Sequence, residues 1–431
     1  MSISVATPES ARPAAGAAAP ADPARRGRVL VAAMAVSAFG PYLFSGVRIE
    51  QITVYGTFAV LVLGFWWMRA TPGRHGAAVM ALLVLQLTVA VIGAVDPPQN
   101  TTRYQGGDVL AGIDNLALPI AILAIVWMLH AAGGDRHALI TLVCRVTVWV
   151  MIGNAGLAAW ATIGSGPDLA VFQSAGTEQS VAFRAEQMGR FSGIFNQPAE
   201  AGLMYSVALL AAIYLYRQRA VLLAATGIAL SLGGILTVSK VFLLVGLPAA
   251  LWQVLRSAGG QGRRMAALVA GALIAWGVLR SGVAPRWTGA KYLSRLLPGG
   301  DQDPLALYTA GRFASGSGLA QVAEAVRGSS PVWGFGAGGL GAAYDNAWIE
   351  ALAINGIAGA ALLTGIVVVL AHAWWSTRRT IGEAESRLAG GLVAVLVGAA
   401  MGVPSLTANR CATIVWLLLA LLLLTGRGPP R

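Results

Sequence analysis

The sequence predicts an all-α polytopic integral membrane protein with about twelve transmembrane helices and two long external loops. Three observations carry this prediction. Of the 431 residues, 56% are hydrophobic and only 11% are charged, whereas a soluble domain carries roughly a quarter charged residues. Apolar runs of roughly 17–25 residues, each long enough to cross the hydrocarbon layer, recur along the chain. The runs are continuous rather than alternating, which favours helices over a β-barrel.

The elements follow in order along the chain. Residues 1–28 form an Ala/Pro-rich segment ending in a late arginine cluster, which predicts a disordered cytoplasmic leader rather than a cleaved signal peptide. Residues 29–425 are expected to form a single transmembrane domain, followed by a cytoplasmic tail at 426–431. The spans are predicted near 29–47, 51–68, 76–95, 113–132, 138–163, 199–216, 220–238, 240–256, 265–283, 346–374, 388–404 and 411–425. The fourth carries Asp114, Asn115 and Pro119, so its first turn is expected to be kinked or to line a polar space.

The short loops predict the orientation. Arginines cluster in every second loop, as at 69–74, 217–219, 256–264 and 378–379, which places these loops and both termini in the cytoplasm of a bacterial inner membrane. The same pattern explains the net charge of +12 without nucleic acid as a partner. Cys144 and Cys411 lie inside apolar runs and are interpreted as packing residues, not as a disulfide or a metal site.

Two connections, 164–198 and 284–345, are much longer than the others and fall on the external, periplasmic side. Loops of this length are functional or disordered. Aromatic and aliphatic residues punctuate them, as in PVWGFGAGGL at 331–340, so we expect folded loops with short amphipathic helices. They also break the charge rule, because they carry Arg184, Arg190, Arg286, Lys291, Arg295, Arg312 and Arg327.

These external cations are candidates for binding a phosphate group. Arg190 and Arg312 each lie in a Gly-Arg-Phe element, and arginine offers a rigid fork of donors that matches phosphate oxygens. An enzyme that cleaves a sugar–pyrophosphate bond must stabilise charge on the leaving group, which fixed cations do. Lys240, at the external end of a span, is a third candidate. The alternatives are contacts with lipid head groups, pairing with nearby acidic residues, and, for Lys240, snorkelling to the interface.

The start of the span near residue 346 carries a candidate acid–base group. Asp345 is placed to accept a proton from a sugar hydroxyl, although a helix N-cap explains an aspartate there equally well. Gly356 and Gly359 follow within the span, at a spacing that lets a neighbouring helix approach closely.

These stretches together resemble the Wzy/WaaL superfamily of O-antigen polymerases and ligases. The resemblance covers residues 189–363 and consists of motifs in a fixed order. They are Gly189-Arg190 through Pro198, Ser239-Lys240, Gly311-Arg312, Gly334-Phe335-Gly336, and Asp345-Asn346 followed after nine residues by Gly356 and Gly359. Two positions depart from the family pattern. Lys240 replaces the usual arginine, and Asp345 stands where ligases carry a histidine, which favours a polymerase, with a slight preference for exopolysaccharide synthesis of the xanthan-like type.

The resemblance implies a metal-independent glycosyltransferase without a cofactor. The donor would be a growing glycan on undecaprenyl pyrophosphate, and the acceptor a single lipid-linked repeat unit at the periplasmic face. Arg190 and Arg312 would hold the pyrophosphate with Lys240, and Asp345, or else Glu200, would deprotonate the acceptor hydroxyl. Gln197, Tyr344 and Asn346 would contact sugar or phosphate. Membrane lipids and a chain-length co-polymerase are the further expected partners.

Two alternatives stay open. The first is a ligase of the same superfamily that acts on another acceptor. The second is a flippase or secondary transporter for the lipid-linked oligosaccharide, which about twelve spans would suit. Transporters concentrate polar groups at the bilayer midplane, whereas the charges here gather in two external loops, with Arg145 as the main exception inside a span.

Overall fold

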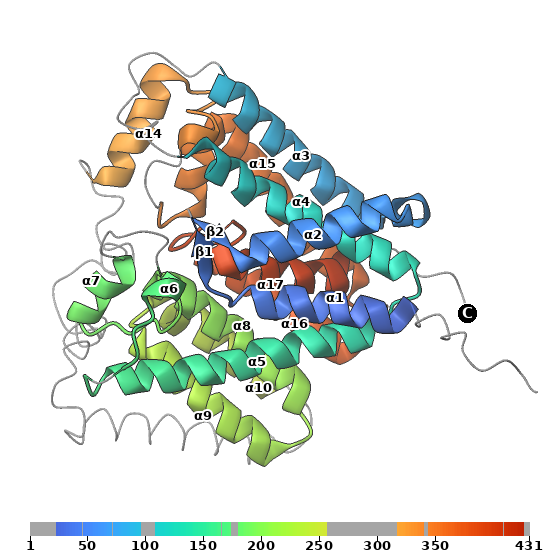
Figure 1. Cartoon of the computed structure of the whole chain (residues 1–431), viewed down its shortest axis with the longest axis vertical. Coiled ribbons are helices and arrows are strands. Elements are labelled where there is room, and N and C mark those ends of the chain that lie inside the picture. The colour runs from blue at the N-terminus through green and yellow to red at the C-terminus, as the bar shows by residue number, and fades with distance from the viewer. Residues whose placement is uncertain are drawn as a thin grey trace, which may run out of the picture.

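The computed structural model describes residues 23–44, 46–70, 72–95, 108–164, 166–173, 180–256, 317–339, 344–407 and 409–425. Within these ranges the chain is helical apart from one small antiparallel hairpin (Figure 1). The first half contains α1 (Pro23–Ser37), β1 (Tyr42–Phe44), β2 (Val47–Arg48), α2 (Ile49–Leu63), η1 (Trp66–Arg69), α3 (Arg74–Val95), α4 (Val109–Ala131), α5 (Arg136–Ala161), α6 (Ala170–Gln173) and α7 (Val181–Gln187). The second half contains α8 (Pro198–Tyr216), α9 (Ala220–Leu236), the π-helical turn η2 (Phe242–Gly246), α10 (Leu247–Arg256), α14 (Gly318–Ser329), η3 (Ala337–Gly339), α15 (Ala347–Thr377), α16 (Glu383–Ala399), α17 (Asn409–Leu419) and the π-helical turn η4 (Ala420–Leu424).

Helices occupy each predicted span that falls within the described residues, while the span predicted near 265–283 lies outside them. Five helices are long and apolar enough to cross a membrane: α3, α4, α5, α8 and α15. Shorter apolar helices cover 49–63, 220–236, 242–256 and 410–424. The chain is therefore a mostly helical protein with several candidate transmembrane helices.

The first helix differs from its predicted span. It begins at Pro23, inside the segment predicted as a disordered leader, and ends at Ser37. Proline suits the first turn of a helix because its missing N–H is unpaired there in any case. Gly40 and Pro41 then interrupt the apolar run, and the hairpin of β1 and β2 follows, with Gly46 at a φ of 83° in its turn. Apolar length alone overlooked this Gly-Pro break.

The helices run back and forth between two ends of the molecule. The hairpin end, to the left in Figure 1, carries β1, β2, α6, α7 and α14, and the C-terminal end lies opposite. At the C-terminal end, Arg136 donates to the Leu422 carbonyl at 2.9 Å, and Pro72 pairs with Thr425. Where they are described, the loops predicted to be external lie at the hairpin end, and the loops predicted to be cytoplasmic lie at the other end (Figure 1).

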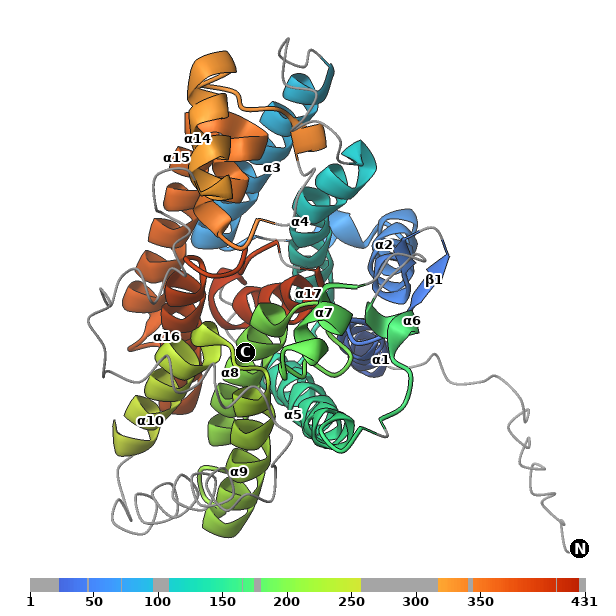
Figure 2. The ribbon, with the colours of Figure 1, turned by 90° about the vertical axis from the view of Figure 1, so that its left-hand side faces the viewer.

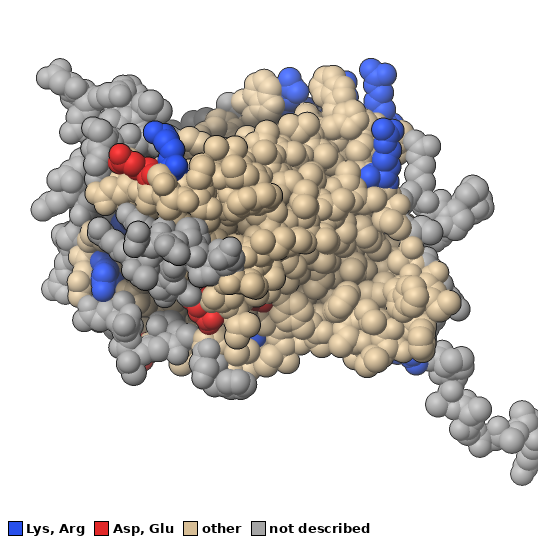
Figure 3. Space-filling model, turned by 90° about the horizontal axis from the view of Figure 1, so that it is seen from above, with Lys and Arg blue, Asp and Glu red and all other residues tan. Residues whose placement is uncertain are grey.

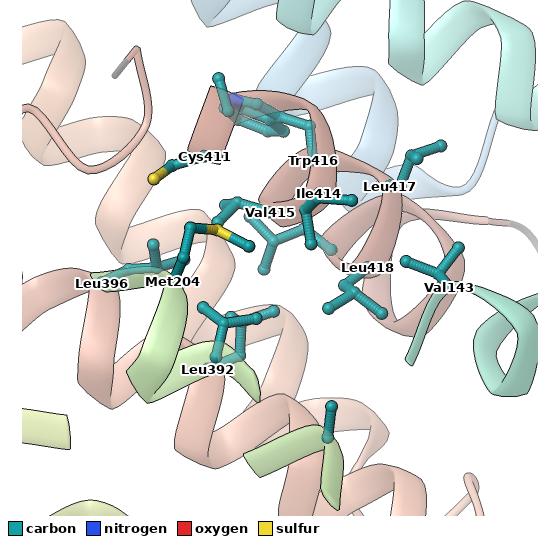
Figure 4. Packing of buried hydrophobic residues seen from close by; sticks show 14 of the residues in the cluster. Val143, Met204, Leu392, Leu396, Cys411, Ile414, Val415, Trp416, Leu417 and Leu418 are labelled. Atoms are coloured by element: carbon teal, nitrogen blue, oxygen red, sulfur yellow. The ribbon is translucent and has the colours of Figure 1, made fainter. Parts of the chain in front are cut away.

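Helix α17 lies at the centre of the bundle. Its side chains from Cys411 to Leu419 are at most 1% exposed. Ile414, Val415 and Leu418 face residues of α5, α8 and α16 (Figure 4). Trp416 is fully buried, and its indole N–H donates to the Leu406 carbonyl at 2.8 Å. A polar indole nitrogen needs such a partner when it is buried. Both Cys144 and Cys411 are buried and free, which confirms their interpretation as packing residues.

The described parts of the two long loops are folded, as predicted. The first contains α6 and α7, and the second contains α14, which packs on α15 through Val322 and Val326 (Figure 2). Lys and Arg gather towards the two sides of the surface in Figure 3, and most of the surface between them is uncharged. Arg145 is exposed on α5, so it does not form a charge buried inside the bundle.

Candidate functional site

Arg190 is positioned by the end of α7. This helix ends at Gln187, and Gly189, two residues later, has a φ of 73°, the left-handed conformation that favours glycine at a helix C-terminus. The Gly189 N–H donates to the Glu186 carbonyl at 2.8 Å, and the Arg190 N–H donates to the Ala185 carbonyl at 2.9 Å. Arg190 is therefore held three residues beyond the helix, and its side chain is half-buried. Burial raises the pKa of the neighbouring Glu186, opposed by a hydrogen bond with Gln173.

The segment after Arg190 is fixed by Asn154 on α5. The side-chain Oδ1 of Asn154 accepts the Ile194 N–H at 2.8 Å, and its side-chain amide Nδ2 donates to the Ser192 carbonyl at 3.3 Å. Gly193 has a φ of 63° and lies so close to Asn154 that a β-carbon there would fall 2.0 Å from the Asn154 Oδ1. Asn154 is 2% exposed and belongs to an apolar span. Sequence reasoning missed it, although a polar residue in a span was the signal that could have found it.

The turn before Lys240 lies against Arg190. The Phe191 N–H donates to the Leu236 carbonyl at 2.9 Å, and the Arg190 Nε donates to the Thr237 carbonyl at 3.4 Å. Val238 has a φ of 48°, which tightens the turn so that a helix restarts at Lys240. The structure thus brings together Arg190 and the Ser239-Lys240 turn, which are some fifty positions apart in the sequence.

The Asp345-Asn346 pair approaches the same turn through the loop after α16. The N-cap of α15 is Asn346, whose side-chain oxygen accepts the N–H groups of Trp348 and Ile349 at 2.9 and 3.1 Å. Its amide donates to the Met401 carbonyl at 3.3 Å. The next residue, Gly402, packs on Val241, which follows Lys240 directly. The capping interpretation of Asp345 is therefore wrong, because Asn346 fills that role.

The remaining predicted site residues divide into two groups. Asp345, Lys240 and Gln197 are half-buried, and Gln197 is the N-cap residue of α8. Asn346 and Tyr344 are buried, and the Tyr344 hydroxyl donates to the Gly339 carbonyl at 2.8 Å. Both residues flank Asp345, and their hydrogen bonds fix the chain on either side of it. Arg312 and Gly311 lie outside the described residues.

The Gly334-Phe335-Gly336 stretch packs on a break in α15 at Gly356. The Phe335 and Gly336 N–H groups donate to the carbonyls of Ala353 and Ile354, and the N–H groups of Ile357 and Ala358 donate to those of Pro331 and Val332. Gly356 has a φ of 62° and a ψ of −154°. The prediction that Gly356 and Gly359 admit a neighbouring helix is wrong. At Gly356 the approaching backbone is that of Val332, and at Gly359 it is the Ala351 carbonyl of the same helix.

A buried charged network at the hairpin end was not predicted as such. Arg48, 3% exposed, pairs with Glu50 and, at 3.3 Å, with Asp114. Asp114 also accepts hydrogen bonds from Gln51 at 2.6 Å and from Tyr55 at 2.7 Å. Asp114 does line a polar space, as predicted, although α4 begins five positions earlier, at Val109, with Asp108 as its N-cap.

The Asp114→Asn variant is expected to lower the free energy of unfolding by about 2 kcal/mol, because an amide cannot accept all three charge-assisted bonds. Denaturant titration in detergent micelles measures the change. Asp108→Asn is the matched control, because asparagine caps helices as well as aspartate does. Equal stability of the two variants would show that the network contributes nothing to folding.

A second buried pair lies beside this network. Glu200, in the first turn of α8, is 4% exposed, and Arg410, in the first turn of α17, is 2% exposed. The Arg410 Nη2 donates to the Phe172 carbonyl. Within the described residues, Glu200 Oε1 and Arg410 Nη1 have no hydrogen-bond partner.

The chemistry of the site follows from its residue types. Two cations, Arg190 and Lys240, lie near a common turn and suit an anionic group such as a phosphate. The stretch that carries Asp345 is linked to that turn through Met401 and Gly402. In the part of the chain that the structure describes, no three His, Cys, Asp or Glu side chains are grouped to hold a metal ion.

Comparison with known proteins adds no family to this description. No protein-family model matches the chain, and no curated protein matches it.

Proposed function

We propose that this protein is a polysaccharide polymerase that transfers a growing glycan from undecaprenyl pyrophosphate to a lipid-linked repeat unit. What supports the proposal is one observation: Arg190 contacts the turn before Lys240 directly, and the stretch around Asp345 is linked to that turn through Met401 and Gly402. These stretches belong to the motifs that resemble the Wzy/WaaL superfamily. An ordered motif set that also meets in space is expected of an active site.

The membrane arrangement in this proposal follows from charge. Exposed arginines such as Arg217, Arg219 and Arg379 lie at the C-terminal end, which suits the cytoplasmic side of the inner membrane. Both termini would then be cytoplasmic, about twelve helices would span the bilayer, and the hairpin end with the loops 164–198 and 284–345 would face the periplasm.

Each site residue has a role in the proposed reaction. Arg190 and Lys240, with Arg312, would hold the pyrophosphate and stabilise the charge it gains as its bond to the glycan breaks. Asp345 would accept the proton of the attacking hydroxyl. The residues require neither metal nor cofactor for this transfer, and a chain-length co-polymerase would be a separate partner.

One observation favours transport of the same lipid as the second candidate. Helix α15 is broken at Gly356, and a small cavity beside the break is lined by Glu350, Asn355 and Gln86. Broken helices and buried polar groups are typical of secondary transporters. A ligase acting on another acceptor is the third candidate.

The test uses lipid-linked repeat units extracted from cells that lack this protein. Purified protein in detergent is expected to convert them into longer glycans, resolved by gel electrophoresis. Transfer to a different acceptor, with no elongation, would favour a ligase. No transfer in detergent, together with movement of the lipid across proteoliposomes, would favour a transporter and overturn the proposal.

The Asp345→Asn variant is expected to lower the elongation rate at saturating acceptor about 100-fold, because an amide cannot take the proton in the transition state. The KM for the acceptor should stay within about twofold, since the base acts mainly in the chemical step. Asp168→Asn, an exposed aspartate of the first long loop, is the control. A normal rate for Asp345→Asn would remove Asp345 from the reaction.

A further inference from the structure

The start of α8 collects buried polar atoms that the protein itself does not satisfy. Besides Glu200 Oε1 and Arg410 Nη1, the Asn196 Oδ1 and the Ser239 Oγ have no hydrogen-bond partner within the described residues. Ser239 packs on Gly202, half a turn beyond Glu200. Such atoms are rare in folded proteins, because an unpaired buried polar group costs about 1–3 kcal/mol. Several of them around one helix start indicate a polar ligand.

Within the described part of the chain, the contacts of Glu200 and Arg410 leave one buried hydrogen-bonding atom of each side chain without a partner. The carboxylate of Glu200 accepts the backbone N–H of Arg410, so the two residues are neighbours. Their side chains do not form an ion pair within the described residues, although their opposite charges interact. Helices α6, α8 and α17 meet here, because Arg410 of α17 donates to the Phe172 carbonyl of α6 and the Cys411 thiol donates to the Glu200 carbonyl of α8.

The two unpaired atoms, Glu200 Oε1 and Arg410 Nη1, define which hydrogen-bonding groups the ligand must offer. Arg410 Nη1 needs an acceptor, and Glu200 Oε1 needs a donor. A hydroxyl group is both at once. A phosphate has acceptors only at neutral pH, and Glu200 with nearby Glu50 would repel it. An ammonium group has donors only, and Arg410 with nearby Arg48 would repel it. A neutral polyhydroxyl ligand, such as a sugar, is the class that fits.

We propose that Glu200 and Arg410 bind a hydroxyl group of the acceptor sugar, next to the hydroxyl that reacts. This inference rests on the proposed function, because it takes the acceptor glycan as the ligand. The hydroxyl oxygen accepts from Arg410 Nη1, and its hydrogen is donated to Glu200 Oε1. The pair sets which repeat unit is accepted, while Asp345 takes the proton of the reacting hydroxyl.

The test measures acceptor binding directly. Lipid-linked repeat units are titrated against wild-type protein and the Glu200→Gln variant. Affinity is expected to fall about 10- to 100-fold, the value of a hydrogen bond to a charged group. The elongation rate at saturating acceptor should change by less than about threefold. Glu324→Gln, an exposed residue of α14, is the control and should bind normally.

A set of deoxy acceptors, each lacking one hydroxyl group, makes the test independent of folding defects. One deoxy acceptor is expected to bind wild-type protein about tenfold more weakly and to lose nothing further on Glu200→Gln. Unchanged acceptor affinity with altered thermal stability would mean that Glu200 and Arg410 hold only water, and would overturn the proposal. A loss of rate with unchanged affinity would make Glu200 the base and would overturn it as well.

The same measurements separate this inference from the proposed function. If wild-type protein elongates the glycan but Glu200→Gln binds acceptor normally, the inference that Glu200 and Arg410 bind an acceptor hydroxyl is wrong, while the proposed polymerase function stands. If wild-type protein does not bind the lipid-linked repeat at all, the proposed function fails and the hydroxyl site fails with it.

Discussion

Replacing Arg190 with alanine is expected to lower the rate of glycan elongation about a thousandfold while the protein stays folded, because a fixed cation on the leaving group is lost. Arg190 lies at the end of α7 and contacts the Thr237 carbonyl through its Nε. This contact holds Arg190 against the turn that precedes Lys240. Its backbone contacts do not depend on the side chain, so the fold should survive. Elongation of purified lipid-linked repeats measures the rate, and size-exclusion chromatography measures folding.

Two further variants make the Arg190 prediction specific. Arg190→Lys keeps the charge but loses the paired donors, so its rate should fall between wild type and Arg190→Ala. Arg184→Ala removes an exposed arginine from α7 itself and should change the rate by less than about twofold. If Arg184→Ala lowers the rate as strongly as Arg190→Ala, general attraction of the anionic lipid would explain the effect, and a specific contact of Arg190 with the pyrophosphate would not.

The Gly356→Ala variant is expected to lower the free energy of unfolding by at least about 4 kcal/mol, the range of the most severe single substitutions. Gly356 has a conformation that only glycine adopts readily. A β-carbon there would lie 2.4 Å from the backbone carbon and oxygen of Val332. Neither α15 nor residues 331–336 can move aside, because backbone hydrogen bonds join these two segments on both sides of Gly356. Denaturant titration in micelles measures the loss.

Gly227→Ala is the matched control for this effect. Gly227 lies within α9, and a β-carbon there meets nothing within 4 Å. Alanine favours a helix by up to about 1 kcal/mol over glycine, so this variant should be as stable as wild type or more stable. Wild-type stability of Gly356→Ala would show that α15 is not broken at this glycine.

Much of the fold could be predicted from apolar length, because a helix in lipid needs a minimum run and carries few charges. The first span shows the limit of this argument. Its apolar run continues through Gly40 and Pro41, but the helix ends at Ser37 and a hairpin follows. Hydropathy is averaged over a window and does not register such a break, whereas the backbone preferences of glycine and proline end the helix there.

The candidate site was predictable in part. The order of motifs suggested that Arg190 and Lys240 act together, and the structure connects them through the Thr237 turn. Asn154, which fixes the segment after Arg190, was missed, because a single polar residue in an apolar run does not show what it contacts. Whether such a residue is exposed, as Arg145 is, or faces the interior depends on how the helices pack. Spacing along the chain does not encode that choice.

The break in α15 has a consequence for how this chain is assembled. The N–H groups of Ile357 and Ala358 and the carbonyls of Ala353 and Ile354 form hydrogen bonds with residues 331–336. Released into lipid without that segment, α15 would carry unpaired backbone groups that each cost several kcal/mol. The segment precedes α15 and is synthesised first, so it must wait beside the insertion machinery until the helix arrives. The two therefore enter the membrane as one cooperative unit of biogenesis, and a substitution in either should trap both at the same stage.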